Sequence, residues 1–295
     1  MKNDRDSIDN LFIIPLIVGA AFLSFAHGAN DVANAMGTSV GSKALTLQQA
    51  IIIAIMFEFA GAYLAGGAVT ATIRKGIIDP ALLAGTPELL VFGMMAALLA
   101  AGTWLLVATY FGWPVSTTHT IVGAIVGFAA VGISADAVNW GKVAKIVASW
   151  VVSPLTAGVI SFFLFRTVQK FILDTEDPFK NAKKYIPFYI FMVGFIIAMV
   201  TFTKGLKHVG LDLSWGQSAL ISIVFGLFTM FIGSMMLKKI QPNPDADREY
   251  HFSSVEKLFG ILMMFTACAM AFAHGSNDVA NAVGPLAAIA SLHQL

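Results

Sequence analysis

The chain has 295 residues, of which 57% are hydrophobic and only 12% are charged, and its formal net charge is +1. Charged residues make up about a quarter of an ordinary soluble domain, so the composition excludes that class. Several apolar runs reach the roughly 20 residues that a membrane helix needs, which predicts a polytopic, all-α integral membrane protein. No basic tract indicates a nucleic-acid partner. The single cysteine, Cys268, excludes an intrachain disulfide and argues against a thiolate metal site.

The first apolar run, from about residue 11 to 36, contains a polar motif that the chain uses twice. Residues 25–37 read FAHGANDVANAMG and residues 272–284 read FAHGSNDVANAVG, so eleven of thirteen positions are identical. Each copy places an aspartate inside an apolar run, where inserting a charge costs about 2.5–3.5 kcal/mol. Ionisable residues in membrane helices typically mark an ion or substrate path, and we expect one here. The run lacks a signal-peptide cleavage site, so we interpret it as a retained span.

The polar residues of each copy recur at i, i+3, i+4 and i+7 and therefore project from one helix face. The first set is His27, Asn30, Asp31 and Asn34, and the second is His274, Asn277, Asp278 and Asn281. An oxygen-rich strip of this kind suits a hard cation such as sodium. The cation ligands that we predict are Asp31, Asn34, Asp278 and Asn281. The alternative is a stripe that only joins helices by hydrogen bonds, a task that seldom needs an aspartate.

The second and third spans cover about residues 47–70 and 89–111. A short loop with Gly37, Gly41 and Lys43 is predicted before the second span. That span carries Glu58 in the context FEFAGA, and an acid within a membrane span indicates function by default. The alternative is a protonated side chain that hydrogen-bonds to a neighbouring helix.

After the third span, residues 112–120 read GWPVSTTHT and a glycine-rich apolar run follows at residues 121–131. Pro114 fits the first turn of a helix but not its interior, and the serine and threonines beside it can cap exposed amides. We therefore predict a helix that stops and restarts inside the membrane. Its new N-terminus favours an anion, and the hydroxyls of residues 116–118 add uncharged donors. The alternative is a capped helix start at the membrane surface.

The remaining full-length spans cover about residues 143–165, 186–202, 215–237 and 258–290. Pro154 predicts a kink in the first of these. Residues 166–184 are polar and of mixed charge, and we predict a solvated loop there. Residues 238–257 are the most hydrophilic segment and separate the last span, which carries the second motif, from the rest.

The distribution of basic residues predicts the orientation of the chain. Residues 166–184 and 238–257 contain five and four basic residues, so we place both in the cytoplasm and the N-terminus outside. The other side also carries basic residues, namely Arg74, Lys75, Lys142, Lys204 and Lys207. If the segment at Pro114 crosses the membrane, six crossings separate the two motifs, which then run in opposite directions. That arrangement is typical of inverted-repeat secondary transporters, which bind substrate between two related halves.

These patterns predict an all-α inverted-repeat secondary transporter with broken or re-entrant helices. Residues 1–165 form the first repeat region, with the motif at 25–37 and PVSTTH at 114–119. Residues 166–257 supply linking spans and cytoplasmic loops, and residues 258–295 begin the second repeat. We expect a multi-pass protein of a bacterial inner membrane, surrounded by lipid. The sequence leaves the oligomeric state open, a homodimer included.

The paired GANDVANA and GSNDVANA, with EFAGA at residues 58–62 and PVSTTH at 114–119, resemble the inorganic phosphate transporter (PiT) family of cation-coupled phosphate permeases. The resemblance runs from about Leu11 to the end of the chain. It implies an alternating-access transporter that moves phosphate with sodium or protons and needs no other cofactor. A second PVSTTH at the spacing seen in the first half would fall beyond Leu295, so we expect a truncated second repeat.

The resemblance also implies roles for individual residues. Phosphate oxygens would be held by Ser116, Thr117, Thr118, Asn30 and Asn277. The cation would be held by Asp31, Asn34, Asp278 and Asn281. Residues linked to transport in other ways would be Glu58, His27, His119 and His274.

Three alternatives to phosphate transport remain at this stage. A transporter for another tetrahedral oxyanion, such as sulfate or arsenate, would use the same kind of site. An intramembrane hydrolase would use Ser116, His119 and Asp31 as nucleophile, base and orienting acid. That hypothesis lacks a glycine elbow around the serine and leaves the doubled motif unexplained, so we expect no enzyme. An ion channel is the third alternative.

Overall fold

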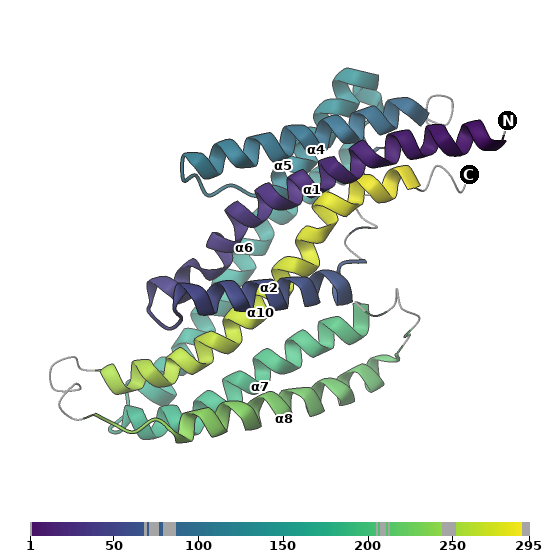
Figure 1. Ribbon diagram of the computed structural model, residues 1–295. Helices are drawn as coiled ribbons and strands as arrows, with labels where there is room; N and C mark the ends of the chain where they lie inside the picture. The colour runs from purple at the N-terminus through teal and green to yellow at the C-terminus, as the bar shows by residue number, and fades with distance from the viewer. Residues whose placement is uncertain are drawn as a thin grey trace. The chain divides into compact units, whose positions relative to one another are not determined.

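The computed structural model describes residues 2–67, 70, 77–78, 87–204, 206, 211, 213–243 and 252–290. This described part is almost entirely helical and contains no β-strand (Figure 1). Seven of its helices are long and apolar enough to cross a membrane, in agreement with the predicted all-α, multi-pass architecture. Of the basic residues used to predict the orientation, Arg74, Lys75, Lys207 and Arg248 lie outside the described residues.

The long helices coincide with the predicted spans. They are α1 (Lys2–Gly41), α2 (Leu47–Ala65), α4 (Pro87–Tyr110), α6 (Trp140–Val168), α7 (Pro178–Lys204), α8 (Trp215–Lys238) and α10 (Ser253–Ala290). A shorter helix, α5 (Thr117–Phe128), passes into a π-helical turn, η2 (Ala129–Ile133). A 3-10 turn, η3 (Ala135–Ala137), precedes α6, and a second π-helical turn, η4 (Gln169–Leu173), follows it.

The connection after α1 differs from the prediction, because Gly37 and Gly41 lie in the helix and not in a loop. A glycine inside a helix costs about 1 kcal/mol relative to alanine, which a helix of 40 residues tolerates. The backbone N–H of Ser42 donates to the carbonyl oxygen of Thr38 at 3.0 Å and closes the helix. The chain then turns at Lys43, whose φ of 61° lies in the left-handed region.

Residues 166–184 are also mostly helical, where the sequence predicts a solvated loop. Helix α6 and η4 continue to Leu173, and α7 already begins at Pro178. Proline is favoured in the first turn of a helix, and the Asp177 carboxylate caps that turn by accepting from the backbone N–H of Lys180 at 2.9 Å. The charged residues therefore lie at the ends of helices. A hydropathy pattern does not distinguish charged helix ends from loops.

The chain forms two compact units that alternate along the sequence. The first comprises residues 1–35, 60–146 and 274–295, and the second comprises residues 36–59 and 147–273. Both copies of the polar motif place their histidine, aspartate and asparagines in the first unit. These units group residues that contact one another, whereas the predicted repeats are consecutive ranges of the sequence. The division into repeats therefore stays a prediction.

Small residues allow close helix packing in the first unit. Gly93 on α4 faces the ring of Phe128 at the end of α5, and Gly102 on α4 faces the ring of Phe22 on α1. Leu98, between these two glycines, is fully buried. Glycine at such contacts lets helix backbones approach closely, as is common between membrane helices. The contacts bring α1, α4 and α5 together around the motif of α1.

The second unit is built around the antiparallel pair α7 and α8, which lie side by side (Figure 1). Gly194 on α7 faces Thr229 on α8, and Gly226 on α8 faces Phe191 on α7. An apolar core at one end of the unit joins these helices to η4 and the start of α10. Its buried members are Ile172, Ala182, Ile186, Ile190, Leu237, Val255 and Leu258.

We predict that Gly226→Val destabilises the α7–α8 pair. A Cβ at this position would lie 2.9 Å from the ring of Phe191 and 3.1 Å from its carbonyl oxygen, so the two helices must separate. The expected loss in free energy of unfolding is about 1–3 kcal/mol, measured by thermal denaturation in detergent. Gly158→Val on α6 is the control, because a Cβ there meets no described atom within 4 Å. Equal denaturation temperatures for the two variants would contradict this account.

Candidate functional site

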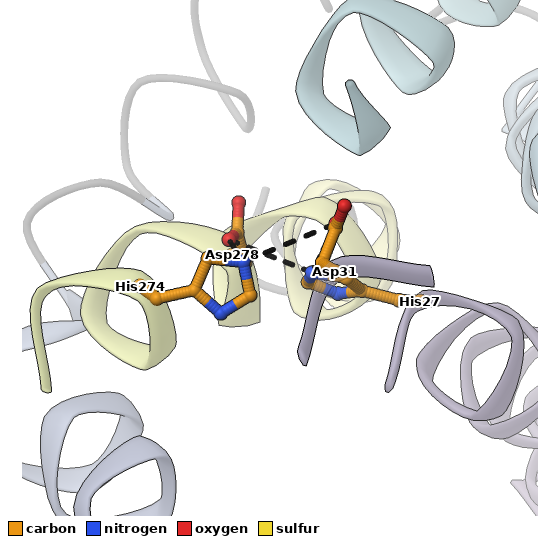
Figure 2. A group of neighbouring side chains, drawn as sticks. All are labelled: His27, Asp31, His274 and Asp278. Atoms are coloured by element: carbon orange, nitrogen blue, oxygen red, sulfur yellow. Dashed lines mark ion pairs between the residues drawn. The ribbon is translucent and has the colours of Figure 1, made fainter. Parts of the chain in front are cut away.

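The two motif copies meet within the first unit. Helices α1 and α10 run in opposite directions there (Figure 1), and the side chains of His27, Asp31, His274 and Asp278 point toward one another (Figure 2). One ligand atom from each of these four residues lies within 4.8 Å of all the others. Both aspartates are buried, with 6% of Asp31 and 7% of Asp278 exposed. Two buried carboxylates therefore share one small space.

The four residues form a nearly symmetric set of ion pairs. Each histidine Nε2 lies close to the Oδ2 atom of the aspartate four residues later, at 2.7 Å for His27 and Asp31 and 2.8 Å for His274 and Asp278. Across the two helices, His27 lies 3.5 Å from Asp278, and His274 lies 4.0 Å from Asp31. The corresponding distances are similar, which indicates an approximate local two-fold relation between the motif copies.

The asparagines of the motifs hold the other carboxylate oxygens. The side-chain amide of Asn34 donates to Oδ1 of Asp31 at 3.1 Å. The amides of Asn281 and Asn277 donate to Oδ1 of Asp278 at 3.0 Å and 3.2 Å. In both motifs Oδ1 is thus occupied by amide donors, and Oδ2 faces the histidines at the centre. The carboxylates are oriented by the residues that the i+3 spacing places beside them.

The predicted break between α4 and α5 is present. Helix α4 ends at Tyr110, the chain turns at Gly112 with a φ of 68°, and α5 begins at Thr117. Ser116 is the N-cap, and its Oγ accepts from the backbone N–H of His119 at 3.3 Å. The helix starts later than the sequence suggests, so Pro114 precedes it and does not occupy its first turn. The N-terminus of α5 nevertheless faces the motif residues.

The first two residues of α5 contact both aspartates. The hydroxyl of Thr117 donates to Oδ2 of Asp31, and the hydroxyl of Thr118 donates to Oδ1 of Asp278 at 3.4 Å. The amide of Asn281 also donates to the Thr118 hydroxyl, at 3.2 Å. The sequence predicts these hydroxyls as donors to an anionic substrate, whereas here they donate to carboxylates. One helix end therefore joins the two motif copies.

A cavity of about 370 Å³ opens beside these contacts. Its lining consists of Asp31, Asn34, Pro114, Val115, Ser116, Thr117, Thr118, His274, Asn277 and Asp278. Hydroxyls, amides and carboxylates therefore surround it, and the described lining contains no lysine or arginine. Any anion that enters this cavity must be held by hydrogen bonds and by ions that arrive with it.

Asn30 and Asn277, which occupy equivalent positions in the two motifs, have different surroundings. The amide of Asn277 lines the cavity, whereas the amide of Asn30 donates to Oγ1 of Thr109 at 3.1 Å and to the carbonyl oxygen of Trp113 at 3.4 Å. Asn30 thus joins α1 to the end of α4 and to the connection between α4 and α5 by hydrogen bonds. These hydrogen bonds do not involve the predicted phosphate site, so the contact of Asn30 with phosphate stays a prediction.

Two other predicted residues are not members of this cluster. Glu58 is half-buried on α2 and belongs to the second unit, so its role in transport stays a prediction. His119 has an exposed side chain on α5 and takes part in the cap through its backbone N–H. Sequence reasoning also missed the contribution of Thr109 and Trp113, because no local pattern connects them to α1. The histidine contacts were foreseeable from the i+4 spacing to each aspartate.

A larger cavity, of about 790 Å³, lies in the second unit. Two lysines, Lys43 and Lys257, and Glu256 line it together with apolar side chains such as Met236 and Phe259. It contains neither motif copy and no cluster of hydroxyl donors comparable to the start of α5. We therefore place the candidate site at the smaller cavity, where the repeated motif converges.

Comparison with known proteins identifies the family. A sequence profile of the phosphate transporter family matches residues 28–294. The chain belongs to this family. A protein of Haemophilus influenzae named "Putative phosphate permease" is 53% identical over 271 residues, which is 92% of this chain and 64% of that protein. The chloroplastic "Inorganic phosphate transporter 2-1" of Arabidopsis thaliana is 38% identical, over 92% of this chain and 49% of that protein.

A solved structure also resembles this one. "The sodium-dependent phosphate transporter" matches with a TM-score of 0.86 and 37% sequence identity, over 96% of this chain and 68% of that protein. The chain therefore spans about two thirds of the length of that transporter and of the Haemophilus relative. Together with the seven apolar helices, family membership identifies a multi-pass integral membrane protein.

The different surroundings of Asn30 and Asn277 generate a prediction about stability. Asn30→Ala removes two hydrogen bonds between α1 and the α4–α5 connection, so we expect it to lower the free energy of unfolding by about 1–3 kcal/mol. Asn277→Ala removes a bond between neighbouring residues at an exposed position and should cost less than about 1 kcal/mol. Thermal denaturation of both variants measures the difference. A larger loss for Asn277→Ala would contradict the assigned roles.

Proposed function

We propose that this protein carries out cation-coupled transport of inorganic phosphate by alternating access. The observation that supports it most is the composition of the 370 Å³ cavity, where hydroxyl and amide donors lie beside two aspartates and the described lining has no lysine or arginine. Such a cavity offers hydrogen bonds to an oxyanion but repels its charge. A cation that binds the aspartates removes the repulsion, so anion and cation are expected to bind together.

The electrostatic coupling is substantial. Two unit charges 4.8 Å apart, the largest separation within the cluster, interact with about 3–4 kcal/mol at an effective dielectric constant of about 20. A phosphate dianion placed beside both aspartates adds further repulsion of the same order. Bound sodium or protons at the aspartates remove this repulsion. The occupancy of the cation sites then controls whether phosphate can enter.

An oxygen atom without a partner supports cation binding near Asp278. The Asn281 side chain is 1% exposed, and its amide nitrogen donates to Asp278 and Thr118. Its carbonyl oxygen Oδ1 is buried and has no hydrogen-bond partner among the described residues. Buried polar atoms are nearly always satisfied, and a carbonyl oxygen beside a carboxylate is a suitable ligand for a hard cation. The name of the solved relative makes sodium the first candidate.

The start of α5 is the proposed phosphate site. Its N-terminal dipole favours an anion, and three hydroxyls at residues 116–118 face the same cavity as Asn277. In the proposed cycle, cations replace the hydroxyl donors at Asp31 and Asp278, and Thr117 and Thr118 then donate to phosphate oxygens. Through these hydroxyls, phosphate binding would thereby depend on whether cations occupy the aspartates.

Alternating access would use the pseudo-symmetry of the two motif copies. The antiparallel crossing of α1 and α10 and the near-equal ion-pair distances are what an inverted repeat requires at its centre. We propose that rocking of one repeat against the other exposes the cavity to either side of a bacterial inner membrane. The hydrolase alternative gains no support, because the Oγ of Ser116 accepts from the backbone N–H of His119, and Asp31 contacts His27.

Sodium-driven phosphate uptake tests the proposal. In proteoliposomes, an inward sodium gradient should accelerate uptake of labelled phosphate, and Asp31→Asn and Asp278→Asn should each reduce the sodium-driven rate about 5- to 150-fold, the usual range of coupling between sites. Asp136→Asn, an exposed charge on η3, is the charge-matched control and should transport normally. Undiminished uptake by both site variants would remove the carboxylates from the mechanism.

The same uptake assay identifies the anion. Excess unlabelled phosphate should abolish uptake of labelled phosphate, while excess sulfate should leave it unchanged. Equal competition by sulfate would favour the alternative of a general oxyanion transporter. Ion currents without saturable phosphate uptake would favour a channel.

The Thr117 hydroxyl should be needed for transport. Thr117→Val keeps the shape of the side chain but removes the donor, and a hydrogen bond to a charged group is worth about 1.5–3 kcal/mol, or roughly 10- to 150-fold in kcat/KM for phosphate. Thr117→Ser keeps the hydroxyl and should retain most of the activity. If the valine variant matches the serine variant, the hydroxyl contributes only to packing.

A further inference from the structure

The larger cavity, which lies in the second unit, is lined by both charged and apolar side chains. Its volume of about 790 Å³ falls within the range of about 300–1,000 Å³ that is usual for small-molecule sites. The charged lining includes Lys43 and Lys257, and the apolar lining includes Phe259, Met263 and Met264. The proposed transport cycle assigns no role to this cavity. A ligand that matches its lining has a charged part and an apolar part.

Ends of four membrane helices meet at this cavity. The connection from α1 to α2 contributes residues 42–45, α8 contributes Met236 in its last turn, and α10 contributes its first turn, which begins at Ser253. Each of these helices is long and apolar enough to cross a membrane. Since the ends of membrane-spanning helices lie in the headgroup region, the cavity lies at the depth of lipid headgroups.

The charge of the lining suits a phosphodiester. Two lysines and one glutamate, Glu256, line the cavity, so its described lining has a net positive charge of one. The side chains of Lys43 and Lys257 are exposed, and neither has an ion-pair or hydrogen-bond partner among the described residues. Both ammonium groups are therefore available to an anionic ligand. A phosphodiester carries a single negative charge, which balances that of the lining.

Exposed apolar side chains continue from the cavity along two helices. Gln49 lines the cavity, and Ile52 and Met56 follow it at i+3 and i+7, on the same face of α2. On α8, Ile232 is exposed four residues before Met236, which also lines the cavity. Both stripes lead from the helix ends toward the interior of the membrane. They provide surfaces for acyl chains whose headgroup lies in the cavity.

We propose that the larger cavity binds one anionic phospholipid, with its phosphodiester held by Lys43 and Lys257 and its acyl chains along α2 and α8. Basic pockets between membrane helices are suited to the headgroups of such lipids. The first turn of α10 adds an N-terminal dipole that favours an anion. The orientation predicted from the basic residues places this end of the second unit at the cytoplasmic leaflet, whose anionic lipids attract lysines.

Inorganic phosphate is the other source of a phosphate group. It carries charge but no apolar part, so it would leave Phe259, Met263 and Met264 without a partner in the cavity. A phospholipid satisfies both kinds of lining. The experiment therefore compares the two sources directly.

Native mass spectrometry of the purified protein in a non-ionic detergent tests the proposal, because it counts bound lipids by their mass. The protein is titrated with dioleoyl phosphatidylglycerol and, separately, with dioleoyl phosphatidylcholine, which has the same acyl chains and phosphodiester but no net charge. We expect one phosphatidylglycerol to bind about fivefold more tightly than phosphatidylcholine, the effect of one net basic charge near a membrane surface. A hundredfold molar excess of inorganic phosphate should not displace it.

Charge variants of the lining supply the decisive comparison. Lys43→Gln and Lys257→Gln should each weaken phosphatidylglycerol binding about fivefold, whereas Glu256→Gln should strengthen it by a similar factor. Lys180→Gln is the matched control, because Lys180 is exposed in the first turn of α7 in the same unit but does not line the cavity. Folding of each variant is verified by its thermal transition, which phosphatidylglycerol should raise in the parent protein.

Three results would overturn the proposal. Equal binding of the two lipids would show that the lysines do not select an anionic headgroup. A loss in Lys180→Gln as large as in the cavity variants would indicate general attraction to a basic surface and not a site. Displacement of phosphatidylglycerol by inorganic phosphate would assign the lysines to the free anion. None of these measurements involves phosphate uptake, so they leave the transport proposal unaffected.

Discussion

Mutual repulsion between Asp31 and Asp278 is the constraint around which the first unit is arranged. The two carboxylates are buried within 4.8 Å of histidine nitrogens and of each other, in helices that are otherwise apolar. Each carboxylate is compensated by a histidine on its own helix, a histidine on the other helix and amide or hydroxyl donors. These contacts explain the spacing of the motif. Its histidine, aspartate and asparagines must all lie on the same helix face, and positions i, i+3, i+4 and i+7 place them there.

Equivalent residues in the two copies nevertheless have different tasks. Eleven of thirteen residues are identical, yet Asn30 fastens the α4–α5 connection whereas Asn277 lines the cavity. The difference arises because Asn30 reaches the end of α4 and the connection to α5, whereas Asn277 donates to its neighbour Asp278. Identical sequence therefore specifies the same helix face twice, but the neighbouring helix decides what each face contacts.

Much of the fold was predictable from the sequence for a clear physical reason. Apolar runs of about 20 residues can satisfy their backbone only as helices in a membrane, so the seven long helices follow from hydropathy. Pro114 and the hydroxyl residues after it predicted the break before α5. The helical ends at residues 37–41 and 166–173 were not predicted, because glycine and charged residues there resemble loop sequence while local hydrogen bonds continue the helix.

The site was predictable only in part. The periodicity of the motif identified the correct side chains, and their duplication suggested that the copies meet. No sequence pattern, however, relates Thr117 to Asp31 or Asn30 to Trp113, because those contacts join residues 86 and 83 positions apart. The histidine pairs across α1 and α10 likewise depend on how two helices cross, which only tertiary packing determines.

The junction between α5 and the two motifs has a mechanical consequence. Thr117 and Thr118 are consecutive residues of one helical turn, about 100° apart around its axis, and each contacts an aspartate on a different helix. A rigid turn cannot retract from one aspartate while staying against the other. In the proposed transport cycle, loading and release of cations at the two aspartates would therefore be tied to a single displacement of α5, which would favour a fixed ratio of cations to phosphate.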